Sequence, residues 1–182
     1  LVLVLLLSPG APSAPGPVKR NLRLRAEEYA EYARGDEVVR NHFKDGYDAD
    51  VSCEPDGDAA RTKTALLAAI LGRMAEVCRE AGVPLVVVAI PSPMDACHEA
   101  KDYTAMRVDR ARYPKYVPSA VTDAIAAAAA GKGIPCPDLF APITAADPVA
   151  LYHRDDDHWN DAGQAFAAKA TAGFLVERGL LK

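Results

Sequence analysis

The residues best suited to chemistry gather near the end of the chain, where Tyr152–Gly163 reads Tyr-His-Arg-Asp-Asp-Asp-His-Trp-Asn-Asp-Ala-Gly. A carboxylate next to the His158 imidazole would fix its tautomer and stabilise its protonated form. A general base that takes a proton from a nucleophile and later returns it has these requirements. The segment therefore predicts a histidine–carboxylate pair in a loop before a helix, where α/β proteins often place functional groups.

Two other interpretations of this segment stay open. In the first, the carboxylates form a solvated acidic turn ahead of an N-capped helix. In the second, His153, Asp155, Asp157 and His158 bind a divalent metal, because carboxylate oxygens and imidazole suit Mn, Zn or Fe.

The residues after His158 predict how the loop is held. Trp159 is bulky enough to anchor the loop against a core, and Asn160 or Asp161 is suited to cap the following helix. Asp161 with Gln164 three residues later also has the pattern of a capping box.

The elements that must position this segment follow from apolar periodicity. Apolar residues at three- and four-residue spacing predict helices over 59–81 and 162–177. An alanine run predicts a further helix that ends at Ala130, with Ser119 or its neighbour as its cap. Continuous apolar runs predict buried strands over 1–7 and 83–90, and a short strand with two prolines over 134–140.

Helices that alternate with buried strands predict an α/β protein, a three-layer α/β/α sandwich with a mainly parallel sheet. Three strands are few for such a sheet, so we expect residues 1–182 to form a single domain that is incomplete at its N-terminus. The stretch 9–57 begins with a proline-rich loop, and we expect it to be irregular apart from one short helix near 25–33.

Composition excludes several classes of function. The 182 residues carry 21 Lys and Arg against 25 Asp and Glu, and no basic block occurs, which disfavours nucleic-acid binding. No apolar stretch reaches the length of a membrane span. The four cysteines contain no zinc-knuckle pair; Cys53 and Cys97 are candidates for a disulfide, although buried free thiols are the simpler expectation.

The segment Asp156-Asp157-His158-Trp159-Asn160, with Gly163 and an alanine-rich last helix, resembles the C-terminal motif of the SGNH (GDSL-type) hydrolases. The resemblance is closest to the alginate acetyltransferase-like branch, which reads Asp-x-His-Trp-Asn. It extends over about residues 59–180, through the strand that ends in Ile90-Pro91-Ser92-Pro93.

The resemblance implies a Ser–His–Asp site for ester chemistry. His158 would be the base and Asp156 its orienting carboxylate; the Asp-x-x-His spacing of other branches would select Asp155 instead. The family's serine lies in a Gly-Asp-Ser motif, which this chain lacks, because Gly35-Asp36 is followed by Glu37. We therefore expect the nucleophile upstream of Leu1.

Three serines within the chain are poorer candidates for the nucleophile. Ser8 precedes a proline-rich loop rather than a helix, Ser92 lies at a strand exit, and Ser119 is placed to cap a helix.

The resulting hypothesis is the C-terminal part of an SGNH-type esterase or O-acyltransferase that acts on a small-molecule or carbohydrate ester without a metal or organic cofactor. Family analogy, with the Cys53–Cys97 pair, favours an exported, periplasmic or cell-envelope location. The alternative is a non-catalytic carbohydrate- or partner-binding module of the same fold.

Overall fold

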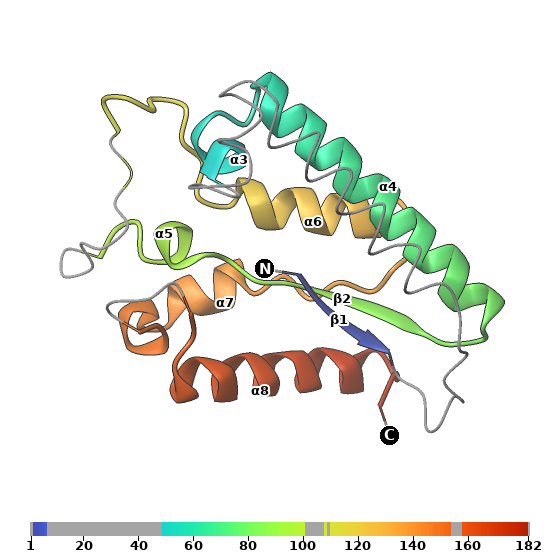
Figure 1. Cartoon of the computed structure of the whole chain (residues 1–182). Coiled ribbons are helices and arrows are strands. Elements are labelled where there is room, and N and C mark those ends of the chain that lie inside the picture. The colour runs from blue at the N-terminus through green and yellow to red at the C-terminus, as the bar shows by residue number, and fades with distance from the viewer. Residues whose placement is uncertain (1, 7–48, 101–107, 109, 154–157, 182) are drawn as a thin grey trace, which may run out of the picture.

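The computed structural model describes residues 2–6, 49–100, 108, 110–153 and 158–181 (Figure 1). Its elements, in chain order, are β1 (Val2–Leu6), α3 (Ala49–Cys53), α4 (Asp58–Glu80), β2 (Leu85–Ala89), α5 (Pro93–Ala96), α6 (Ala120–Ala130), α7 (Phe140–Ala145), the 3-10 helix η1 (Pro148–Leu151) and α8 (Asp161–Glu177).

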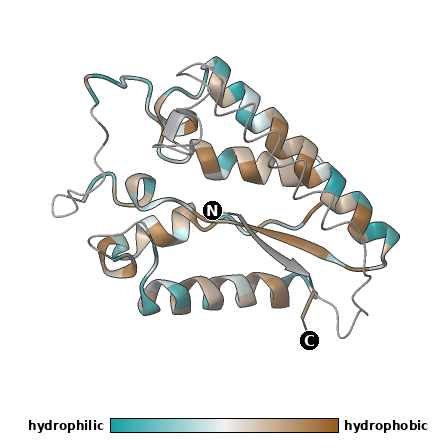
Figure 2. Cartoon of the chain, viewed as in Figure 1, coloured by the Kyte–Doolittle hydropathy of each residue, from teal (hydrophilic) through white to brown (hydrophobic). Residues whose placement is uncertain are grey.

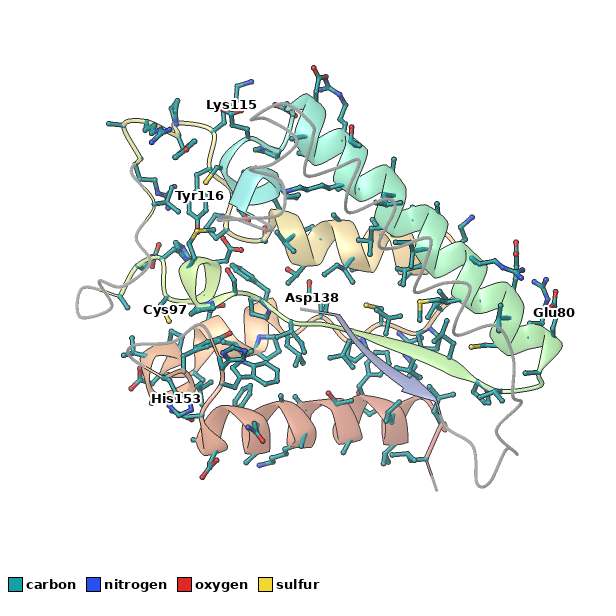
Figure 3. All side chains as sticks on the ribbon, in the orientation of Figure 1. Glu80, Cys97, Lys115, Tyr116, Asp138 and His153 are labelled. Carbon is teal, nitrogen blue, oxygen red and sulfur yellow. The ribbon has the colours of Figure 1, made fainter. Side chains whose placement is uncertain are left out.

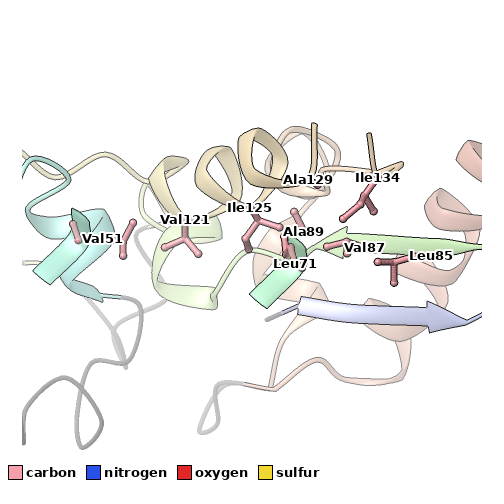
Figure 4. Close-up of a cluster of buried hydrophobic side chains, with 10 residues drawn as sticks. Val51, Leu71, Leu85, Val87, Ala89, Val121, Ile125, Ala129 and Ile134 are labelled. Atoms are coloured by element: carbon pink, nitrogen blue, oxygen red, sulfur yellow. The ribbon is translucent and has the colours of Figure 1, made fainter. Parts of the chain in front are cut away.

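Strand β2 is the centre of the molecule, and every one of its residues is buried. Side chains alternate between the faces of a strand, so β2 serves two cores. Leu85, Val87 and Ala89 join the cluster made with α4 and α6, which we call the upper core (Figure 4). Val88 and the following Ile90 join the cluster made with α7, η1 and α8, which we call the lower core.

Helices therefore cover both faces of β2, with α4 and α6 on one side and α7 and α8 on the other (Figure 1). The hydropathy colouring follows this arrangement, since β2 is apolar along its length and α4 is mixed (Figure 2). Helices on both faces of a buried strand agree with the predicted α/β class.

The sheet differs in part from the prediction of parallel strands. β1 pairs with β2 in the antiparallel sense, in a register from Val2 opposite Ala89 to Leu6 opposite Leu85. A continuous apolar run such as residues 1–7 reads alike in either direction, so the sequence carries no signal for the polarity of the strand.

The segment before α7 pairs with the other edge of β2, and in the parallel sense. Val87 N donates to Pro135 O at 3.1 Å, and Ala89 N donates to Pro137 O at 3.0 Å. Leu139 N then donates to Ala89 O at 3.0 Å. Pro135 and Pro137 only need to accept in this ladder, which is why a proline-containing segment can form it.

The three predicted helices are present as α4, α6 and α8, and their ends differ from the prediction by at most one residue. Ser119 occupies the N-cap position of α6, yet its side chain makes no capping hydrogen bond. The predicted helix near 25–33 lies outside the described residues. α3 is helical, so the stretch 9–57 is more regular at its end than we expected.

Within the described ranges, none of the helices combines the length and the apolar character that crossing a bilayer requires.

Candidate active site

The predicted catalytic segment is a hairpin that leads into α8. Tyr152 and Trp159 pair as an antiparallel bridge, and His153 N donates to His158 O at 3.0 Å. His153 and His158 both lie on the exposed surface of this hairpin. Its tip, residues 154–157, lies outside the described residues, so Asp155 and Asp156 are not placed and their pairing with His158 stays a prediction.

Asn160 fastens the hairpin to its neighbours with both ends of its side-chain amide. Its Oδ1 accepts from Gly163 N at 3.0 Å, which caps the first turn of α8. Its Nδ2 donates to Ala150 O at 2.8 Å and to Tyr152 O at 3.2 Å. An aspartate could provide the cap but not the two donated bonds, so asparagine suits this position best.

The N-terminus of α8 decides which of the two candidates, Asn160 or Asp161, caps the helix, and it contradicts the predicted capping box. Asn160 rather than Asp161 is the N-cap residue. The capping box predicted for Asp161 and Gln164 is therefore wrong: Asp161 is already the first helical residue, and Gln164 N donates to Asn160 O at 2.9 Å.

Gly163 is required by a close approach between α8 and η1. A Cβ atom at this position would lie 2.1 Å from Leu151 O, a distance that only a backbone shift can relieve. The spacing from Trp159-Asn160 to Gly163 thus has a structural reason: the helix must begin against the end of η1.

Trp159 anchors the hairpin as expected, because it packs against the lower core. Its ring centroid lies 6.4 Å from that of Tyr152, at an interplanar angle of 54°. The Tyr152 hydroxyl, itself buried, donates to Pro91 O at 2.9 Å. This bond joins the hairpin to the exit of β2, 61 residues earlier in the chain.

A buried polar cluster lies beyond Pro91, at the start of α5. The Asp95 carboxylate accepts from the hydroxyls of Ser52 at 3.0 Å, Ser92 at 3.1 Å and Tyr116 at 2.9 Å. Ser92 also accepts from Asp95 N at 3.2 Å and so caps α5. The spacing Ser-x-x-Asp over 92–95 is a capping-box signal that could have identified half of this cluster, whereas nothing local points to Ser52 or Tyr116.

Burial dominates the electrostatics of this cluster. Desolvation and then the Asp95 charge raise the pKa of Tyr116 far above its usual range, so its hydroxyl remains a hydrogen-bond donor. The Arg110 guanidinium lies 4.5 Å from the centre of the Tyr116 ring, and its positive charge partly opposes this rise in the pKa of Tyr116.

No disulfide joins any two of the four cysteines, so the candidate Cys53–Cys97 pair is not bonded and the simpler expectation of thiols is confirmed. Both residues are buried. Burial, together with the charge of Asp147, raises the pKa of Cys97 to about 11.

An open cavity of about 400 Å³ lies beside the hairpin, lined by Asp147, Val149, Ala150, Tyr152, His153 and Asn160. Figure 3 shows His153 at this end of the molecule, on the same side of β2 as Cys97. No three His, Cys, Asp or Glu side chains of the described ranges come together as a metal site would require. Of the four ligands in the metal interpretation, only the two histidines fall within those ranges.

The serines are placed as follows. Ser92 caps α5, Ser119 is the N-cap residue of α6, and Ser8 lies outside the described residues. Ser52, which sequence reasoning did not single out, is wholly buried against Asp95.

Comparison with protein families gives one match, to the family described as "SGNH hydrolase-like domain, acetyltransferase AlgX", over residues 47–181. No curated protein and no solved structure matches the chain. The matched range includes β2, the Asp95 cluster, the hairpin and α8, with their α/β arrangement. The chain therefore belongs to the family of SGNH hydrolase-like domains of the AlgX acetyltransferase type.

Proposed function

We propose that this chain supplies the histidine–carboxylate half of a Ser–His–Asp site that transfers acyl groups between oxygen atoms. His158 is the general base, and Asp156 is its orienting carboxylate, with Asp155 as the alternative. The nucleophilic serine comes from outside residues 1–182.

The observation that carries this proposal is the way the hairpin is built. Trp159, Asn160 and Gly163 each have a defined task in holding His158 at the start of α8. A merely solvated acidic turn would not need an asparagine with three bonds or a glycine pressed against a carbonyl. The exposed position of His158 leaves its ring accessible to a serine from another part of the protein.

The chemistry follows the general pattern of serine-dependent acyl transfer. The His158 imidazole takes the serine proton as the hydroxyl oxygen attacks the ester carbonyl. The tetrahedral intermediate expels the alcohol, which leaves with that proton, and an acyl-serine remains. An acceptor hydroxyl then gives its proton to His158, attacks the acyl-serine and releases the serine, which regains the proton.

The substrate class is a small-molecule or carbohydrate ester, and a sugar hydroxyl or water is the acceptor. The family's description as an acetyltransferase favours an acetyl group and a hydroxyl acceptor. We place the protein in an exported, periplasmic or cell-envelope setting by the same analogy; the disulfide that would have supported this independently is absent.

The decisive experiment compares the two histidines of the hairpin in the full-length protein. His158→Ala should lower kcat for hydrolysis of an acetyl ester by about 10⁴-fold, as for a member of a catalytic triad. His153→Ala is the matched control, because the His153 backbone N–H donates to His158 O in the same hairpin and the His153 side chain is also exposed. It should retain activity within threefold of wild type.

Labelling with a serine-directed phosphonate, followed by mass spectrometry, should find the modified serine outside residues 1–182. Near-normal turnover by His158→Ala would overturn the proposal and leave the non-catalytic binding module as the better explanation. Equal loss in both histidine variants, with activity abolished by a chelator, would overturn it in favour of the metal-dependent alternative.

A further inference from the structure

We propose that Tyr152 is a positioning residue for His158, and that the buried Asp95 cluster holds the point to which Tyr152 is fixed. This inference rests on the function proposed above. It concerns three consecutive links that run from the interior of the protein to the exposed imidazole.

The first link is the Asp95 cluster. The Asp95 side chain is 1 % exposed and receives hydroxyl hydrogen bonds from three separate segments of the chain. Burying a carboxylate is costly unless such donors compensate it. The three hydroxyls offset the desolvation of the Asp95 carboxylate only while they stay within hydrogen-bond distance of it. The cluster therefore favours one arrangement of the segments that carry Ser52, Ser92 and Tyr116.

Those segments surround the exit of β2. Ser52 brings α3 to the cluster, and its backbone carbonyl also accepts from Val117 N at 2.8 Å. The Tyr116 hydroxyl also lies 3.2 Å from Met94 O, which shares the single hydroxyl proton with Asp95. Ser92 is the residue directly after Pro91. The Pro91 carbonyl is therefore attached to a part of the backbone that several bonds hold still.

The second link is the bond from the Tyr152 hydroxyl to that carbonyl, at 2.9 Å between buried atoms. Tyr152 is only 3 % exposed, so a displaced hydroxyl could not turn to bulk water. A buried phenol without an acceptor loses free energy, and this loss resists any movement of the hairpin away from β2.

The third link joins Tyr152 to His158 across the hairpin. Tyr152 pairs with Trp159 in an antiparallel bridge. One residue closer to the tip of the hairpin, His153 N donates to His158 O. A shift of Tyr152 must therefore move the backbone that carries the imidazole. A general base needs its ring within hydrogen-bond reach of the proton that it abstracts, so small shifts reduce turnover.

The test removes one oxygen atom. Tyr152→Phe keeps the ring in the lower core but deletes the bond to Pro91, and we expect kcat of the full-length protein to fall about tenfold with KM within twofold of wild type. Tyr113→Phe is the matched control, because the Tyr113 ring is only partly buried and lies beside Arg112 rather than in the cluster. It should leave both constants unchanged.

A second readout does not depend on catalysis. The His158 imidazole signal in the NMR spectrum of the 182-residue chain is identified by its absence in His158→Ala. The chemical shift of this imidazole signal should change in Tyr152→Phe. It should change less in Asp95→Asn, and also in Ser92→Ala, which removes only one bond to Asp95. Tyr113→Phe should leave it unchanged. Trp159 is the only tryptophan of the chain, and its fluorescence should change with the imidazole signal.

The outcomes separate the two proposals. An unchanged imidazole signal and unchanged kcat in Tyr152→Phe would overturn the positioning role, even if His158→Ala is inactive. A shifted signal in Tyr152→Phe supports the three links even if His158→Ala remains active, a result that would overturn only the proposed function.

Discussion

The two faces of β2 are packed by different kinds of side chain. The upper core consists of aliphatic residues from β2, α3, α4 and α6 together with Ile134, and Leu71 and Ile125 lie at its centre (Figure 4). The lower core adds two aromatic residues with polar atoms, Tyr152 and Trp159, and both belong to the hairpin that carries His158. The upper face thus supplies apolar burial, whereas the lower face also fixes the place of a polar loop.

This difference has a physical basis. Aliphatic packing contributes stability in proportion to the area it buries and tolerates adjustment of individual side chains. Hydrogen bonds such as those of Asn160 and Tyr152 contribute less free energy but depend on direction and distance. A site that must hold an imidazole in place gains more from the second kind of contact.

The largest effect on stability should come from the upper core. Leu71→Ala removes a side chain that is 1 % exposed and should lower the free energy of unfolding by about 2–5 kcal/mol, measured by denaturant titration. The fluorescence of Trp159 in the folded variant should match wild type, because the cavity opens on the other side of β2.

Leu66→Ala is the matched control for that change. It lies on the same helix but is 55 % exposed, so its effect should be small. A Leu71 variant as stable as the Leu66 variant would contradict the upper core as described.

A smaller but more local effect should follow from Gly163→Ala. The added Cβ collides with Leu151 O, and relief of this overlap by moving the hairpin should cost about 1–3 kcal/mol despite the better helix propensity of alanine. Unlike Leu71→Ala, this variant should alter the Trp159 fluorescence of the folded state. Gly173→Ala, in the same helix with open space around its Cα, should instead be neutral or stabilising.

The smallest expected effect is on the pH dependence of stability, and it involves one thiol on each face of β2. Burial raises the pKa of Cys97, in the lower core, and of Cys136, beside the upper core, from 9.0 to about 11. The folded state therefore favours the protonated thiols. Their contribution to the free energy of unfolding is complete below pH 9, where the thiols of the unfolded chain are also protonated. This contribution is lost as pH rises through about 11.

Unfolding titrations at pH 7, 8 and 10.5 should show nearly constant stability over the first interval and a loss over the second. Cys97→Ala and Cys136→Ala should each reduce that loss. If neither variant changes the alkaline slope, the two thiols do not titrate as their burial implies.

Much of the fold was accessible from apolar periodicity alone. Apolar residues at three- and four-residue spacing indicated the helices α4 and α8, and the alanine run indicated α6. The strand β2 was indicated by a short β-branched apolar run that follows a glycine. The polarity of β1 was not accessible, because a continuous apolar run reads alike in both directions. For α8, Asn160 and Asp161 were equivalent candidates until their backbone positions were known.

The sequence by itself determined which residue types meet near His158, because they are neighbours in the chain and their chemistry is fixed by identity. Only the tertiary structure decided what holds them: the bond from Tyr152 to Pro91, the contact of Gly163 with η1, and the joining of Ser52 and Tyr116 at Asp95. Each of these joins positions separated along the chain, and such contacts depend on how α3, β2 and α8 pack rather than on any local pattern of residues.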